Sequence, residues 1–218
     1  MADQAGSSAG TTTASASVAQ PGWMRNLQQT CKNLVKLLPT SIAGSSTLPI
    51  NESANAREDP LTRFYRRESE IGQKLLKQVL GDLLTLIACC KGEIKQTNHI
   101  RELIEIINKG GIPVAWQRYK FEEGISLMQW TSDFARRLKQ LEAIEQKTVG
   151  DERAIWLGGL FRPAGWITAT RQRTAHREGV SLEALQLELK LGSHDHEGYA
   201  LQSESLYMPA PKKMLRKS

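Results

Sequence analysis

The segment from Asp59 to Cys90 constrains the fold more than any other part of this chain, because its apolar residues recur at helical spacing without interruption. Asp59-Pro60 is typical of a helix start, in which a capping side chain is followed by proline at the first helical position. The helix that begins there is predicted to run to about Cys90. The broad apolar face predicted for this helix contains Ile71, Leu75, Leu76, Val79, Leu80, Leu83, Leu84 and Ile87.

Four further helices are predicted over Trp23–Leu38, Gln96–Asn108, Ser126–Glu145 and Pro163–Arg177. A proline follows the first and a Gly-Gly pair follows the second, and both signals end helices. We expect the helix over 96–108 to fold back on the helix over 59–90 as an antiparallel hairpin. The apolar residues expected to face inward from the first three of these helices are Leu27, Cys31, Leu34, Leu38, Ile100, Leu103, Ile104, Ile107, Leu127, Trp130, Phe134, Leu138 and Leu141.

Strand signals are confined to the last third of the chain. Ala154–Leu157 is short and apolar, which is consistent with a buried strand or a tight turn. Residues 185–191 alternate leucine with polar side chains, the period of a strand. Tyr199, Leu201, Tyr207 and Met208 are assigned to a further strand. The predicted fold class is therefore mainly α with a small β part near the C-terminus, a helical bundle followed by a truncated β region.

The two ends of the chain are predicted to lie outside the hydrophobic core. Met1–Gln20 is rich in Ala, Ser, Thr and Gly and cannot bury enough apolar surface to offset its ordering entropy, so we expect a flexible linker. The loop over Ser41–Arg57 and the basic tail over Lys212–Ser218 are also predicted to lie outside the core.

No stretch approaches the roughly 20 apolar residues of a membrane span, and no secretory signal is recognised. The three cysteines show no metal-binding spacing and favour a reduced compartment.

The sequence offers little for catalysis or ligand binding. A phosphate-binding loop needs two glycines followed by lysine, and Gly44-Ser45-Ser46-Thr47 has neither the second glycine nor the lysine. His194-Asp195-His196-Glu197 has residue types that suit zinc or nickel, but a solvated loop is the favoured interpretation. The net charge of +6 arises from 29 basic and 23 acidic residues that are largely interspersed, which does not favour nucleic-acid binding. We expect no cofactor, no metal and no membrane partner.

A long series of ordered fragments resembles the C-terminal domain of dynein heavy chains. The most informative is LGGLFRPAGWITATRQRTAH over 157–176, in which the string over 167–172 is more similar to the cytoplasmic branch than to the axonemal one. The resemblance runs from about Trp23 to Gly192. It divides the chain into a disordered linker over 1–21, a domain over 22–192, and a partial β segment with a basic tail over 193–218. The other fragments that carry it are Pro21–Arg25, Leu37–Pro39, Asp59–Leu61, Phe64, Glu68, Gly72–Leu76, Lys95–Asn98, Leu103, Lys109–Pro113, Trp116, Gln129-Trp130, Asp133-Phe134 and Leu138–Leu141.

The resemblance implies a non-catalytic structural and regulatory domain that packs on the AAA+ ring of a dynein heavy chain and contributes to microtubule-based movement. It implies a cytoplasmic, cytoskeleton-associated location, with the dynein complex and microtubules as indirect partners. Nucleotides bind in modules upstream of this domain in the family, so this chain is not expected to be an ATPase. Longer members continue past Gly192 into strands that close a small barrel, so the chain is interpreted as a fragment or truncated copy.

Two other interpretations remain open at this stage. One is a free-standing helical protein-interaction module, and the other is a small hydrolase or metal protein that uses His194–Glu197. Tryptophans at such positions are usually core, which we expect for Trp130, whereas Trp166 is either core or interface. Basic clusters on helices are usually solvated, and the alternative is that they pair with acidic groups on the AAA+ ring. The candidate interface residues are Trp166, Arg171, Arg173, Arg136 and Arg137.

Overall fold

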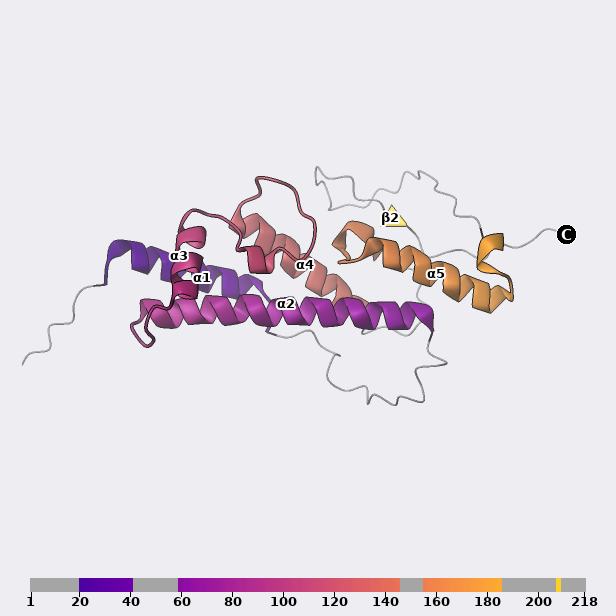
Figure 1. Cartoon of the computed structure of the whole chain (residues 1–218), viewed down its shortest axis with the longest axis horizontal. Coiled ribbons are helices and arrows are strands. Elements are labelled where there is room, and N and C mark those ends of the chain that lie inside the picture. Colours follow the sequence, from indigo (N-terminus) through magenta and orange to yellow (C-terminus); the bar gives the residue numbers. More distant parts are fainter. Residues whose placement is uncertain (1–19, 41–58, 146–154, 186–206, 209–218) are drawn as a thin grey trace, which may run out of the picture.

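The computed structural model describes residues 20–40, 59–145, 155–185 and 207–208. Within these ranges the chain is mainly helical, as predicted, with one long helix as its axis (Figure 1). The helices are α1 (Gly22–Leu37), α2 (Pro60–Cys90), α3 (Asn98–Asn108), α4 (Leu127–Glu145) and α5 (Pro163–Glu178). Short 3-10 segments are η1 (Val114–Trp116), η2 (Leu157–Gly159) and η3 (Leu182–Ala184).

Local capping explains where α2 and α3 begin and end. The Asp59 carboxylate accepts hydrogen bonds from the backbone N and the hydroxyl of Thr62 at 3.1 and 3.2 Å, which confirms the predicted start of α2. The hydroxyl of Thr97 accepts from the Ile100 backbone N at 3.3 Å and begins α3. Gly110 follows the end of α3 with a φ of 72°, a left-handed conformation that suits glycine.

Helix α1 lies along the C-terminal half of α2 and runs antiparallel to it (Figure 1). Gln20, just before α1, donates through Nε2 to the carbonyl oxygen of Cys90 at the end of α2, at 2.7 Å. Helix α3 stands across this end of α2, so the antiparallel hairpin predicted for these two helices is wrong (Figure 1). The reason is that α1 and α4 already cover the apolar face of α2, and α3 closes only its end.

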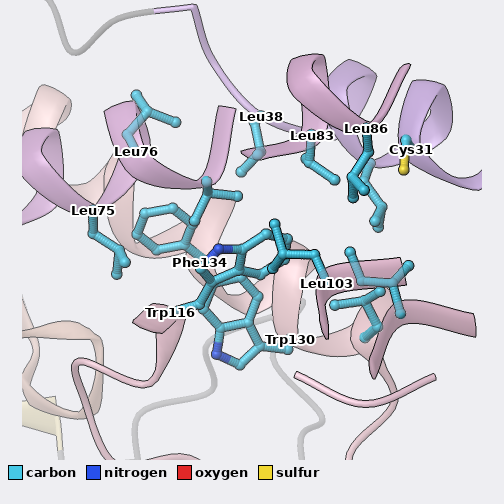
Figure 2. Close-up of a cluster of buried hydrophobic side chains, with 14 of the residues drawn as sticks. Cys31, Leu38, Leu75, Leu76, Leu83, Leu86, Leu103, Trp116, Trp130 and Phe134 are labelled. Atoms are coloured by element: carbon cyan, nitrogen blue, oxygen red, sulfur yellow. The ribbon is translucent and has the colours of Figure 1, made fainter. Parts of the chain in front are cut away.

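A stack of aromatic side chains fills the main core between α2, η1 and α4 (Figure 2). The ring of Trp130 stacks on Trp116 and Phe134, with centroids 5.6 and 5.4 Å apart, and on Tyr119 at 6.0 Å. Trp116 donates through Nε1 to the Asp82 carboxylate at 2.8 Å, so its polar atom is satisfied. The expectation that Trp130 belongs to the core is confirmed.

The apolar face of α2 is rotated slightly from the predicted one. Leu84, assigned to that face, is 55% exposed, whereas Leu86, Cys89 and Cys90 are buried. Cys31 of α1 is buried on this face of α2 as well, and all three cysteines are free thiols. Burial raises the pKa of the Cys31 thiol to about 12, so it stays protonated and packs as a small apolar side chain.

A small β element is present. Strand β1 (Ile155–Trp156) pairs antiparallel with β2 (Tyr207–Met208), with Ile155 opposite Met208 and Trp156 opposite Tyr207. The segment left open as a buried strand or a tight turn contains both, since β1 is followed directly by η2 from Leu157. Of the strand predicted from Tyr199, Leu201, Tyr207 and Met208, the last two residues form β2 and the others lie outside the described residues. At the predicted strand over 185–191, only Leu185 is described, directly after η3, and the remainder lies outside the described residues.

Several other sequence-based predictions also fall outside the described ranges. They concern the linker over 1–19, Gly44–Thr47, His194–Glu197 and the basic tail over 212–218. Among the helices that the structure describes, none combines the length and the apolar character needed to cross a membrane.

Candidate protein interface around the loop before α5

Trp166 lies inside the chain and not on its surface. It belongs to a second apolar cluster, where α5 meets the N-terminal half of α2 and the end of α4. Its indole Nε1 donates to the Tyr65 hydroxyl at 2.9 Å. Burial raises the pKa of Tyr65 to about 12, which keeps this hydroxyl protonated. Trp166 is therefore packed in the core of this chain, and its contribution to an interface stays a prediction. The cluster consists of Phe64, Leu141, Leu157, Leu160, Trp166 and Ala169.

Arg137 is buried, with 5% of its surface exposed, so the default expectation of a solvated basic cluster is wrong for this residue. Its Nε donates to the Asp133 carboxylate at 2.7 Å, and its guanidinium lies 4.1 Å from the centre of the Tyr119 ring. Its Nη1 donates to the carbonyl oxygens of Gly158 and Leu160. Arg137 therefore holds the loop between β1 and α5 against α4.

Glu68 of α2 holds the same loop from the other side. Its side chain is 1% exposed, and its Oε2 accepts a hydrogen bond from the backbone N of Phe161. Burial raises the pKa of this carboxyl, while the backbone N–H groups of Phe161 and Arg162 and the positive charges of Arg162 and Arg137 oppose that shift. Two buried side chains thus hold consecutive parts of one loop, Arg137 through backbone carbonyls and Glu68 through backbone N–H groups of the loop. We call this pair the loop clamp.

The glycines of the loop are required by close packing. An added Cβ at Gly159 would lie 2.2 Å from the Trp156 ring, and one at Gly158 would lie 2.9 Å from the same indole. Gln140 of α4 fixes the backbone of Trp156 from both sides, donating to its carbonyl at 3.1 Å and accepting from its N–H at 3.0 Å. The Gly-Gly pair therefore lets the loop turn directly over the indole.

The three remaining candidate arginines are partly exposed and already have partners within the chain. Arg136 lies with its guanidinium 3.7 Å from the centre of the Trp156 ring and 3.2 Å from the Asp133 carboxylate. Arg173 pairs with Asp59 at 3.3 Å and ties α5 to the start of α2. Arg171 donates to the Leu182 carbonyl at 2.9 Å and to the Leu185 carbonyl at 3.3 Å, which holds η3 against α5. Whether these residues also contact another protein stays a prediction.

Glu68 and Gln140 were not predicted from the sequence as structural determinants. Both are polar residues of helices, whose side chains are solvated by default, and their partners are 93 and 16 positions away. Their role is to support the loop. In the described ranges, no group of three or more His, Cys, Asp or Glu side chains is arranged to hold a metal ion.

The sequence matches one known family over most of its length. A family model described as the C-terminal domain of the dynein heavy chain matches residues 1–208. The chain is 37% identical over 176 residues to a cytoplasmic dynein heavy chain of Caenorhabditis elegans, covering 81% of this chain and 4% of that one. It is 38% identical over 175 residues to the cytoplasmic heavy chain of Dictyostelium discoideum, covering 80% and 4%. Identity to human dynein axonemal heavy chain 9 is 27% over 128 residues, covering 57% and 3%. The chain thus spans a small fraction of the length of the curated relatives it matches.

Proposed function

Because the chain belongs to the family of C-terminal domains of dynein heavy chains, we propose that it acts as a non-catalytic structural and regulatory domain of a cytoplasmic-type dynein heavy chain. In this role it packs on the AAA+ ring and contributes to movement along microtubules. The observation that carries the proposal is the match to cytoplasmic heavy chains, at 32–38% identity over about four fifths of the chain.

The packing of the domain supports a mechanical role. The loop clamp, the hydrogen bonds between Gln140 and the Trp156 backbone, and the Arg173–Asp59 pair join three helices through buried or partly buried polar contacts. Such contacts fix the relative positions of helices rather than create a reactive centre. A domain that relays position to a neighbouring ring needs this rigidity.

The five candidate interface residues divide into two groups in this proposal. Arg136, Arg171 and Arg173 keep part of their surface exposed and would meet acidic groups of the ring directly. Trp166 and Arg137 are buried and would act by holding α5 and the loop in place. Cytoplasmic, cytoskeleton-associated localisation and membership of a dynein complex follow from the same proposal.

A domain exchange tests this function. The C-terminal domain of the Dictyostelium cytoplasmic motor is replaced by this chain, and microtubule gliding velocity and microtubule-stimulated ATPase activity are measured. We expect the chimaera to behave more like the intact motor than like the motor with the domain deleted. A chimaera that is folded but identical to the deletion would contradict the proposal and favour a free-standing interaction module. Replacing both Arg136 and Arg173 with Ala should weaken the rescue, with Lys139→Ala, an exposed lysine on α4, as the control.

A further inference from the structure

Helix α1 presents an outward face that packs against no other helix among the described residues. The helix contains no acidic residue, and its three cations Arg25, Lys32 and Lys36 are all exposed. They are spaced by seven and four positions, so they form one row about 16 Å long on one flank of the helix. Among the described residues, no carboxylate forms an ion pair with any of them. We call them the basic row.

The other flank of the same face is apolar. Trp23 is 46% exposed and Leu37 is 41% exposed, although both residue types are usually buried. They are fourteen positions apart, close to four helical turns, so they lie on the same side of α1. Trp23 borders a groove of about 420 Å³ between α1 and the end of α3. The groove is lined by Trp23, Asn26, Leu27, Thr30, Ile107 and Asn108.

A seam of amide side chains separates the two flanks. Asn26, Gln29 and Asn33 lie between the basic row and the apolar edge on the helical wheel, and Gln29 donates to Asn33 at 3.0 Å. The outward face therefore has cations on one side, amides along the middle and apolar surface on the other. The opposite side of α1 is the one that contacts α2, through Leu27, Cys31 and Leu34.

We propose that the outward face of α1 docks an acidic amphipathic helix of a partner protein. A helix laid along the amide seam would place carboxylates against the basic row and an apolar side chain in the groove beside Trp23. Carboxylates on such a helix recur at the same spacing of seven and four positions, so one straight partner helix can meet all three cations. The surface is distinct from the residues around the loop before α5, so this inference does not depend on the proposed contact with the AAA+ ring.

The arrangement of the two flanks favours a protein helix over a lipid surface. A helix that lies on a membrane has its apolar stripe in the centre of the bound face with cations on both sides of it. In α1 the amides occupy the centre, and the apolar edge and the basic row lie at opposite sides.

The test uses the whole chain and a labelled synthetic helix of about 20 residues, with Glu at the matching spacing on one flank and Leu on the other. Binding is followed by fluorescence anisotropy at two salt concentrations. Trp23 is the only exposed one of the five tryptophans, so an indole emission shift that is lost in Trp23→Phe reports the groove directly. Reversing the charge of the basic row in the triple variant Arg25→Glu, Lys32→Glu, Lys36→Glu should weaken binding of the peptide roughly tenfold or more.

A charge-matched control separates docking from general attraction to a basic protein. Arg101→Glu, Lys120→Glu and Lys139→Glu change the net charge by the same amount at exposed positions outside α1, and this variant should bind within about twofold of the original. Equal losses in the two triple variants would overturn the proposal. So would binding to phosphatidylserine vesicles, with the same dependence on Trp23, in the absence of binding to the peptide. Circular dichroism confirms that each variant is folded.

Discussion

Replacing Glu68 separates two properties of this buried carboxyl in the loop clamp, its role as a hydrogen-bond acceptor and its ability to ionise. Its Oε2 satisfies the backbone N–H of Phe161, and its other oxygen, Oε1, is buried without a hydrogen-bond partner in the described structure. Glu68→Ala removes the acceptor and leaves a buried N–H unpaired, which costs about 1–3 kcal/mol. Glu68→Gln keeps an acceptor of the same size and removes only the ionisable group.

The two variants should therefore differ in their dependence on pH. Burial raises the pKa of Glu68 above the ordinary value of 4.5, so the folded state favours the protonated form. The stabilisation from this group is complete below the unfolded pKa and is lost as pH rises through the folded pKa. Glu68→Gln lacks that loss. The stability of Glu68→Gln relative to the original chain should therefore increase as pH rises from 4.5 to the folded pKa of Glu68. Over this range the original chain loses stability because its buried carboxyl ionises more readily in the unfolded state.

Urea unfolding monitored by tryptophan fluorescence, at pH 5 and pH 8, measures both effects. Glu68→Ala should be destabilised by about 1–3 kcal/mol at pH 5 and by less at pH 8, because at high pH it also removes a buried charge. The guanidinium groups of Arg137 and Arg162 act on Glu68 in the original chain and are present in every variant. The histidines are also present in every variant, so their titration cancels in the stability differences. If the difference between Glu68→Gln and the original chain is the same at both pH values, the carboxyl is not held protonated by burial and the reasoning is refuted.

The packing and the sequence lead to three further expectations. Gly159→Ala should destabilise the chain by at least about 2 kcal/mol, because the added Cβ would collide with the Trp156 ring. Gly81→Ala has open space around it on α2 and should stabilise the chain by about 0.5–1 kcal/mol. The urea unfolding midpoints of the two variants measure this contrast. Trp130→Ala should cost about 3–5 kcal/mol and abolish the near-ultraviolet circular dichroism of the aromatic stack, and retention of that signal would contradict the assignment. The purified chain should neither hydrolyse ATP nor bind it, and displacement by ATP of a fluorescent analogue bound at micromolar concentration would count against the proposed non-catalytic role.

Features coded by neighbouring residues were predictable from the sequence. The start of α2 depends on Asp59 and Pro60, and the end of α3 depends on Gly110, so each boundary is determined within a few residues of itself. The apolar period of α4 likewise predicted the burial of Trp130 and Phe134, because a helix that repeats apolar residues every three or four positions has one inward face.

Features that depend on distant partners were not predictable in the same way. Arg137 resembles a solvated residue in its own helix, and only the loop carbonyls 21 and 23 positions later make its burial favourable. Trp166 could not be assigned because its partner, Tyr65, is 101 positions away. Periodicity also fixes the face of a helix only approximately, which is why Leu84 was placed in the core although it lies at the margin of the buried stripe.

The two apolar clusters share a single continuous helix, α2, which contributes Leu75–Leu86 to one and Phe64 to the other. Its 31 residues span about 46 Å, and its interior contains no proline. Helix α1 packs against one end of this helix and α5 against the other. A tilt of about 10° around one end carries the far end through roughly 8 Å, given this length. A rigid rotation of α2 about its end beside α5 would therefore displace the end beside α1 by about the distance between the axes of two packed helices.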